Sequence, residues 1–476
     1  MSPFELSQAV ENLKVFFTNF SDLDGRYDPE FYRSREKLIK NFFYPLDKIS
    51  NSFFIKDGDH DKLPVDAISD ELEGKRYLRS QDLKNNEIIS ANPVYVSSEY
   101  FKKMSRCHIY AGDLLFSIMA SVGATAIVPN GFPSCMANRA VGILRPKKYS
   151  RFLPEYVQVL FNSNVGMALI NIQKRGGIQQ RINLADIGQL RMPVPDENIQ
   201  KKIIDIYSNA LNLKKEKEVA SQSLLDSIDT YLLNELGIIF PRQDNSLDER
   251  MFFSSVKDVS GGRFDSDFHR VFYKDLTLEL LKKTKVEKIK DISLAVFQGV
   301  GKDEVSFSEF KLLKVKNIKQ NNEIDFSEIE YIKHVPHRKI LCFNDIISPF
   351  IGEAIKQYKF SSFVERQGKY TVDNNTGVIR INTSLCNPIY VCDILNSVLV
   401  KFQIDRYLGG GGVPFLGASR VKEILIPIVP IEKQNEIAAH IQSIREQAAE
   451  LQREAVQILE DAKVQIERMI LGDSEV

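Results

Sequence analysis

The chain has 476 residues, 43% of them hydrophobic and 26% charged, so it is long enough for two or more domains with buried cores. Lys and Arg together number 63, as do Asp and Glu, and this neutrality argues against a protein that coats nucleic acid by charge alone. The five cysteines show no C-x-x-C pair and the N-terminus shows no signal peptide, which favours a cytoplasmic protein with reduced thiols and no membrane role.

The sequence repeats itself at an offset of about half its length. Gly25–Asp28 returns as Gly262–Asp265, Ala111–Ser117 as Phe343–Ser348, Pro154–Ser163 as Pro388–Ser397, and Met192–Pro195 as Ile426–Pro430. Aligning Gln200 with Gln434 gives an offset of 434 − 200 = 234 residues. A period this long is not a solenoid unit. It predicts two copies of one domain, each with its own core.

Within the first copy, the pattern changes from helix to strand and back to helix. Residues 1–24 read as a short amphipathic helix, and Asp28-Pro29 reads as a helix start. Short β-like runs follow at Arg76–Arg79, Ile88–Ile89, Val94–Val96, Leu114–Met119, Ala124–Val128 and Val141–Leu144. The period is helical from Pro154, and a short helix at Leu184–Leu190 precedes the stop at Pro193-Val194-Pro195. The second copy runs the same course from about 262 to 430.

The apolar stretch Leu114–Pro129 is too short to span a bilayer. Serine, glycine and threonine interrupt it, so we expect a buried β-hairpin that turns at Ser121-Val122-Gly123.

Each copy ends in a long helical segment. In the second, a seam of apolar residues alternates gaps of four and three, the heptad pattern of a coiled coil, at Ile437, Ile441, Ile444, Ala448, Leu451, Ala455, Ile458 and Ala462. In the first, the seam is Ile203, Ile206, Ala210, Leu213, Ala220, Leu224, Ile228, Tyr231 and Leu232, with a polar interruption at residues 214–218. One alternative is that each helix packs on its own domain and does not pair with the other helix. We favour antiparallel pairing of the two helices, because a domain–helix–domain–helix chain then closes with pseudo-two-fold symmetry.

The fold prediction is therefore α+β, with two tandem mixed α/β domains and an antiparallel coiled coil. The predicted segments are domain 1 at residues 1–195, a central helix at 196–237, domain 2 at 238–430 and a C-terminal helix at 431–476.

We find no catalytic motif in the sequence. Asn92-Pro93-Val94-Tyr95 and Asn387-Pro388-Ile389-Tyr390 lack the second proline of the amino-methyltransferase signature, and Asn387 reads better as a helix cap before a first-turn proline. Gly409–Gly412 lacks the lysine and serine of a phosphate-binding loop. His334, His337 and Cys342 read as exposed loop residues and not as a metal site, because no matching pair of ligands lies nearby.

Polar loops rich in nitrogen are the candidate functional residues. The segment Lys174–Asn183 combines arginines, glutamines and an asparagine with paired glycines, and these side chains are the ones that read guanine and adenine edges. A surface loop of chance polarity explains this segment equally well. Ile55–Lys62 and Tyr77–Asn86 are similar in kind, and Leu313–Asn322 is the counterpart of the latter in the second copy. The DNA-contact candidates are Lys56, His60, Lys62, Arg79, Gln81, Lys84, Lys174, Arg175, Gln179, Gln180, Arg181, Asn183, Lys314, Lys316 and Lys319.

Taken in order, several motifs resemble the specificity subunit of Type I restriction–modification systems. They are Asp57–His60, Tyr77–Leu83, Gly112–Ser117 with Gly123, Asn138–Val141, Leu160–Ser163, and Gly176–Leu184 through to Pro195. The resemblance covers nearly the whole chain in two copies. The second copy departs from it, with Gln298–Gly301 in place of Asp-Gly-x-His and Gly412–Phe415 in place of Gly-Ile-Gln-Gln.

The resemblance implies two target-recognition domains that each read half of a bipartite site in double-stranded DNA. It also implies that the helices set the gap between the half-sites and dock two DNA-methyltransferase subunits, through which restriction subunits would join. This chain would then be non-catalytic and bind no cofactor, and its partners would use S-adenosylmethionine, ATP and magnesium. Two alternatives stay open: a recognition subunit paired with a fused methyltransferase–nuclease, and a coiled-coil scaffold that does not bind DNA.

Overall fold

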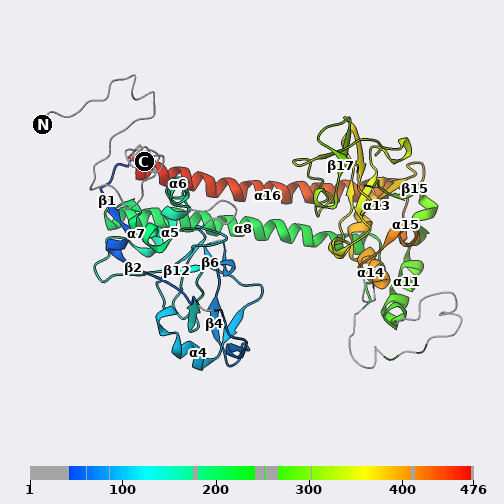
Figure 1. The fold of residues 1–476 in the computed structure, drawn as a ribbon. Coiled ribbons are helices and arrows are strands. Elements are labelled where there is room, and N and C mark those ends of the chain that lie inside the picture. The colour runs from blue at the N-terminus through cyan, green and yellow to red at the C-terminus, as the bar shows by residue number, and fades with distance from the viewer. Residues whose placement is uncertain are drawn as a thin grey trace, which may run out of the picture. The chain divides into compact units, whose positions relative to one another are not determined.

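The computed structural model describes residues 42–60, 62–84, 86–174, 181–241, 251, 253, 266–301, 303–408 and 413–472. The chain divides into two compact units, unit 1 (Met1–Glu216 with Glu454–Val476) and unit 2 (Lys217–Arg453). Each unit contains one copy of the repeat and parts of two long helices, α8 (Glu197–Glu235) and α16 (Ile431–Leu471) (Figure 1). The predicted helix at residues 1–24 and the start at Asp28-Pro29 lie outside the described residues.

Unit 1 contains two sheets and a set of helices. Its strands are β1 (Leu46–Lys48), β2 (Phe53–Asp57), β3 (Ile68–Ser69), β4 (Lys75–Leu78), β5 (Leu83–Lys84), β6 (Glu87–Ile88), β7 (Val94–Val96), β8 (His108–Ile109), β9 (Leu114–Ser117), β10 (Thr125–Ile127), β11 (Cys135–Ala137), β12 (Val141–Pro146) and β13 (Arg191–Pro193). Its shorter helices are α3 (Ile49–Ser52), α4 (Ser98–Lys103), α5 (Pro154–Asn162), α6 (Asn164–Gln173) and α7 (Leu184–Gln189). The sheet orders are β10-β9-β12-β2 and β3-β7-β4-β11-β8, and two small pairs, β1-β13 and β5-β6, complete the unit.

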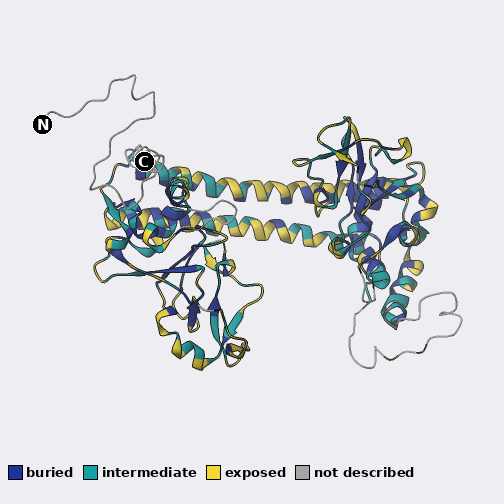
Figure 2. Cartoon of the chain, viewed as in Figure 1, coloured by how far each residue is buried: buried dark blue, intermediate teal, exposed yellow. Residues whose placement is uncertain are grey.

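The predicted buried hairpin is confirmed. Strands β9 and β10 pair antiparallel with Phe116 opposite Thr125, and every residue of β9 is buried. One apolar cluster fills the space between the two sheets, and a second joins β9 and β12 to α5, α6, α7 and the long helices. Figure 2 shows the buried positions gathered where the strands meet these helices.

The helical run after Pro154 forms two helices, because Ser163 interrupts it. Ser163 has extended backbone angles, and its hydroxyl accepts a hydrogen bond from the Gly166 amide as the N-cap of α6. A side chain at Gly166 would place Cβ 1.7 Å from the Leu160 carbonyl oxygen, so the tight connection needs glycine.

Unit 2 repeats this architecture. Its strands are β14 (Lys285–Lys288), β15 (Ser293–Gln298), β16 (Glu304–Val305), β17 (Phe310–Leu313), β18 (Glu330–Ile332), β19 (Ile346–Pro349), β20 (Ser361–Ser362), β21 (Lys369–Val372), β22 (Thr376–Ile381) and β23 (Leu425–Ile428). Its shorter helices are α11 (Val271–Lys283), α12 (Ile289–Ile292), α13 (Pro388–Asn396), α14 (Val398–Leu408) and α15 (Gly417–Val421). The order β15-β22-β19-β20 matches β2-β12-β9-β10 of unit 1. Asn387 caps α13 through the amides of Ile389 and Tyr390, as predicted, with Pro388 at the first helical position.

Matching polar contacts explain why particular residues recur in both copies. The guanidinium of Arg145 binds Asp113 at 2.7 Å, and that of Arg380 binds Asp345 at the same distance. The side-chain oxygen of Gln200 accepts from the Leu153 amide at 2.9 Å, and that of Gln434 accepts from the Asn387 amide at 2.9 Å. Each glutamine therefore ties the start of a long helix to the helix-starting loop of its own domain.

The predicted antiparallel pairing of the long helices is confirmed inside each unit. In unit 1, Ile203 and Tyr207 near the start of α8 share a cluster with Ile466 and Ile470 near the end of α16. In unit 2, the end of α8 meets the start of α16: Leu232 and Leu236 share a cluster with Ile437 and Ile441, and the Ser221 hydroxyl donates to the Ala448 carbonyl at 2.8 Å.

The seam on α16 lies where the heptad pattern predicts it. Its buried members are Ile437, Ile441, Ile444, Ala448, Ala455 and Ala462, and Leu451 and Ile458 are half-buried. On α8, Ile203 and Ala210 are buried and Leu224 and Ile228 half-buried. Two assignments on α8 are wrong, because Leu213 is 47% exposed and Ala220 is exposed, whereas Tyr207 and Ser221 are buried in the seam. A straight helix drifts by about 20° per heptad, which moves the buried line by one residue across the polar interruption.

Candidate nucleic-acid interface

Four polar segments of unit 1 meet at one edge, at the strand ends. The Asn138 amide donates to the Leu78 carbonyl at 2.9 Å, and the Asp59 amide donates to the Ala137 carbonyl at 2.8 Å. The Ile118 amide donates to the Ala140 carbonyl at 2.9 Å, and the Ile182 amide donates to the Ile118 carbonyl at 3.1 Å. We call residues 57–60, 79–82, 138–140 and 181–183 the strand-end edge of unit 1. Three of the segments chosen from sequence therefore contribute to one surface.

A charged cluster holds the first of these segments. Arg106 donates from Nη1 to Asp57 Oδ1 at 3.2 Å and from Nη2 to the Gly58 carbonyl at 3.2 Å. His60 pairs with the same carboxylate. Burial raises the pKa of Asp57, but the hydrogen bonds from His60 and Arg106 outweigh burial and hold this pKa below its usual value. The side chains of His60 and Arg106 remain 56% exposed, so both can reach a ligand.

Arg79 has an internal structural role at this edge. Its guanidinium donates to Asp82 Oδ2 at 3.3 Å and to the Asn92 carbonyl at 2.7 Å. The buried Asp82 also accepts from the Arg79 amide and from the Ser90 hydroxyl. Gln81 is exposed beside this guanidinium, and its amide oxygen accepts from Arg79 when turned toward it.

The other candidates of unit 1 are spread more widely. Lys56 and Lys62 are exposed on β2 and on the loop beyond the edge, and Lys84 is exposed on hairpin β5-β6. Lys174 is half-buried at the end of α6, and Arg181 and Asn183 are exposed before α7. Arg175, Gln179 and Gln180 lie outside the described residues.

Unit 2 builds the same edge with the same backbone contacts. The Asp373 amide donates to the Leu313 carbonyl at 3.0 Å, and Val300 pairs with Asp373 as Asp59 pairs with Asn138. The Phe350 amide donates to the Asn375 carbonyl at 2.8 Å, and the Leu416 amide donates to the Phe350 carbonyl at 2.9 Å. The strand-end edge of unit 2 therefore comprises residues 299–301, 314–317, 373–375 and 415–416.

The lysines predicted in the second copy are paired with carboxylates. Lys314 binds Glu304 at 2.7 Å and also Glu330, Lys316 binds Glu328 at 3.2 Å, and Lys319 binds Asp325 at 3.1 Å. A DNA phosphate would have to compete with these carboxylates for the lysines. Contact of these lysines with DNA therefore stays a prediction.

Sequence reasoning missed two cations in equivalent 3-10 turns, Arg106 and Lys339. Lys339 Nζ donates to the Gly299 carbonyl at 2.6 Å, as Arg106 donates to Gly58. No shared motif surrounds these cations, so only the fold brings them together.

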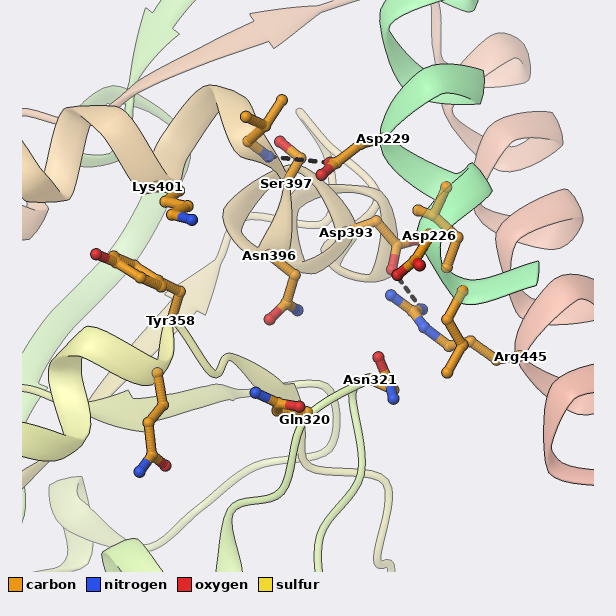
Figure 3. A pocket seen from close by; sticks show the side chains of 14 residues that line it. Asp226, Asp229, Gln320, Asn321, Tyr358, Asp393, Asn396, Ser397, Lys401 and Arg445 are labelled. Carbon is orange, nitrogen blue, oxygen red and sulfur yellow. Dashed lines mark hydrogen bonds and ion pairs between the residues drawn. The ribbon is translucent and has the colours of Figure 1, made fainter. Parts of the chain in front are cut away.

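A polar recess of about 410 Å³ lies at the base of the domain in unit 2, between α8, α13 and α16. Figure 3 shows Asp393 and Arg445 paired beside Asp226 and Asn321. Both partners are buried, their closest N–O distance is 2.5 Å, and burial raises the pKa of Asp393 to about 6 although Arg445 opposes this rise. At the 234-residue offset the first copy has Val159 and Leu211 there, so this buried ion pair belongs to one copy only.

Among the residues the structure describes, no group of three or more His, Cys, Asp or Glu side chains could hold a metal ion. His334, His337 and Cys342 are all exposed. In the described part of the chain, no helix is long and apolar enough to cross a membrane.

Comparison with known proteins bears directly on unit 1. Residues 66–221 match the family model described as the Type I restriction modification DNA specificity domain. This segment is similar to a DNA specificity domain of that family. It includes the 79–82, 138–140 and 181–183 segments of the strand-end edge and continues into α8. The resemblance to Type I specificity subunits seen in the sequence is thereby confirmed.

Several solved structures are similar to this chain over most of its length. A chain from a structure of complex assembly and conformational transition of the type I R-M system matches with 11% identity and a TM-score of 0.52, covering 90% of this chain and 98% of that one. The S subunit from M. genitalium matches with 12% identity, coverage of 90% and 96%, and a TM-score of 0.43. The HsdS subunit from Thermoanaerobacter tengcongensis matches with 13% identity, coverage of 90% and 97%, and a TM-score of 0.36. No curated protein matches the sequence.

Proposed function

We propose that each unit reads one half of a bipartite target in duplex DNA through its strand-end edge. The observation that carries this proposal is the repetition of that edge, once within a DNA specificity domain and once in the second copy, with the same backbone contacts. Two equivalent surfaces on one chain suit two separate sites on one ligand. The side chains on the two surfaces differ, as reading two different half-sites requires.

We further propose that the long helices dock two DNA-methyltransferase subunits, with restriction subunits joining through them. Side chains on both helices support this. Val219 on α8 and Val456 on α16 are 63% and 59% exposed, although each lies on an otherwise polar helix surface. Apolar side chains exposed on the helices of the chain alone are available for burial against a partner protein. The partners would supply S-adenosylmethionine, ATP and magnesium chemistry, and the complex would act in the cytoplasm.

Methylome sequencing tests the proposal. The chain is expressed with the methyltransferase subunit of its own system in a host that lacks other DNA methylation. We expect one bipartite motif whose two halves are separated by a gap of constant length. Methylation of a single continuous motif, or none above the level of the methyltransferase alone, would contradict the proposal.

A fused methyltransferase–nuclease partner would give the same motif, and the genes beside this one distinguish that arrangement. A scaffold that does not bind DNA would give no shift of a duplex carrying the motif at any salt concentration.

A further inference from the structure

The turn between the two sheets is built alike in both units but displays different side chains. In unit 1 it joins β11 to β12 through residues 138–140, and in unit 2 it joins β21 to β22 through residues 373–375. Parallel pairing of Ala137 with Leu78 and of Val372 with Leu313 fixes the correspondence residue by residue. Arg139 of unit 1 therefore stands where unit 2 has Asn374.

The first side chain of each turn accepts a hydrogen bond from a residue two or three positions further along the chain. Asn138 Oδ1 accepts from the Ala140 amide at 3.0 Å. Asp373 Oδ1 accepts from the Thr376 hydroxyl at 2.7 Å. The carbonyl of the third residue of each turn also accepts a hydrogen bond from the neighbouring segment, from the Ile118 amide in unit 1 and the Phe350 amide in unit 2. The middle side chain, Arg139 or Asn374, is exposed in both units.

The other matched cations at the two edges have partners within their own domain. Arg79 and Lys314 are bound to carboxylates, and Arg106 and Lys339 are bound to the carbonyls of Gly58 and Gly299. Within the described ranges, Arg139 has no carboxylate partner and the Asn374 amide makes no hydrogen bond. At this matched position, both units therefore display a polar side chain that the shared scaffold leaves available.

Arginine and asparagine read different bases. The arginine fork donates two hydrogen bonds to guanine O6 and N7, whereas the asparagine amide binds adenine N6 and N7. On the basis of the proposed DNA-reading function, we infer that Arg139 and Asn374 are specificity-determining residues. Arg139 contacts a guanine in one half-site and Asn374 contacts an adenine in the other. Hydrogen-bonded turns suit this role because a direct base contact requires a fixed side-chain origin.

The test exchanges the two residues in the full chain and maps methylation in the same host. Arg139→Asn is expected to replace guanine by adenine, or lose the base preference, at one position of one half-site. Asn374→Arg is expected to act at one position of the other half-site. In duplex-binding assays, Arg139→Ala should reduce the preference for guanine over another base at that position by roughly 5- to 150-fold.

Two control variants and an unfolding measurement separate base recognition from the effects of charge and of folding. Arg139→Lys keeps the charge but loses the fork, so it should lose base preference as the alanine variant does. Lys148→Ala removes an exposed cation beyond the opposite end of β12 and should leave the motif unchanged. Thermal unfolding of the Arg139 and Asn374 variants should match that of the wild type, since both side chains are exposed.

The inference is overturned if the wild type gives a bipartite motif and the exchanged variants methylate that same motif with the same preference. It is also overturned if Arg139→Lys behaves as the wild type, because the contact would then be one of charge. A wild type that gives no bipartite motif rejects the proposed function itself, so the two failures are distinguishable.

Discussion

At two glycines of the strand-end edges, there is no space for a side chain. A Cβ on Gly58 would lie 2.2 Å from the Ala137 carbonyl oxygen, and one on Gly299 would lie 2.0 Å from the Val372 carbonyl oxygen. These clashes involve backbone, which cannot rotate away. The glycine shared by Asp57–His60 and Gln298–Gly301 is thereby explained, although the surrounding motif differs.

We expect Gly58→Ala and Gly299→Ala each to lower the free energy of unfolding by roughly 1–3 kcal/mol or more. Gly301→Ala is the matched control, because a Cβ there meets nothing within 4 Å. Chemical denaturation of the three variants measures the difference. Equal stability of Gly299→Ala and Gly301→Ala would contradict the close approach.

The buried pair Asp393–Arg445 can be tested by replacing it with the residues that the first copy has at these positions. Removing only Arg445, as Arg445→Leu, leaves a buried carboxylate without its partner and should destabilise unit 2 by about 3–5 kcal/mol. The double variant Asp393→Val with Arg445→Leu restores the apolar pair Val159 and Leu211 of copy 1, and should be as stable as the wild type or more stable by about 1–4 kcal/mol. Denaturation of both variants measures this reversal. Additive losses would mean that the site in unit 2 cannot repack.

The same pair predicts a pH dependence. Burial raises the pKa of Asp393 to about 6, above its ordinary value of 3.8, so between these values the folded state holds the proton more tightly. The contribution of Asp393 to stability is therefore greatest at low pH and falls as pH rises through about 6. Relative to the Asp393→Val, Arg445→Leu variant, the wild type should lose stability between pH 4 and 6. Parallel stability curves across that range would contradict this assignment.

At the level of elements, each domain is tied to a long helix through the start of its second helix. The Asn164 amide at the start of α6 donates to Glu467 Oε1 of α16 at 2.6 Å. The Val398 amide at the start of α14 donates to Asp229 Oδ1 of α8 at 2.9 Å. A carboxylate suits both places, because the first amides of a helix lack partners and the helix dipole favours negative charge there. Each domain therefore contacts the long helix that follows the other copy in the sequence.

Lengthening both long helices should change only the gap between half-sites. One heptad inserted between Glu216 and Lys217 and another between Arg453 and Glu454, where the compact units divide, adds about 10 Å to each helix and rotates its face by only about 20°. We expect a gap longer by about three base pairs with both half-sites unchanged, as read by methylome sequencing. A heptad inserted in one helix only is the control and should disrupt pairing. An unchanged gap in the double insertion would contradict the ruler role of the helices.

At the level of the whole molecule, the 63 basic and 63 acidic residues balance, and ion pairs within the domains also balance charge locally. Several cations near the strand-end edges are matched by nearby carboxylates, as with Lys314, Lys316 and Arg106. We therefore expect the chain alone to bind duplex DNA with a shallow salt dependence, a slope of about −3 to −5 in log affinity against log salt. The slope should steepen when the methyltransferase is bound. Titrations at several salt concentrations measure both slopes, and a slope near −10 for the chain alone would contradict this account.

The sequence alone determined the duplication, strands β4, β6, β7, β9, β10 and β12 of the first copy with the β9-β10 hairpin, and the antiparallel helix pairing. The strands and the hairpin depend on local periodicity and turn chemistry, and the helix pairing follows from the order of domains and helices along a duplicated chain. Only the tertiary structure decided which polar loops share an edge, which cations are committed to partners, and that Arg139 and Asn374 occupy equivalent turns. Those facts arise from parallel strand pairing between segments some 60 residues apart, such as Ala137 with Leu78. The α8 seam shifts onto Ser221 because a straight helix drifts relative to a strict heptad, which the pattern alone did not reveal.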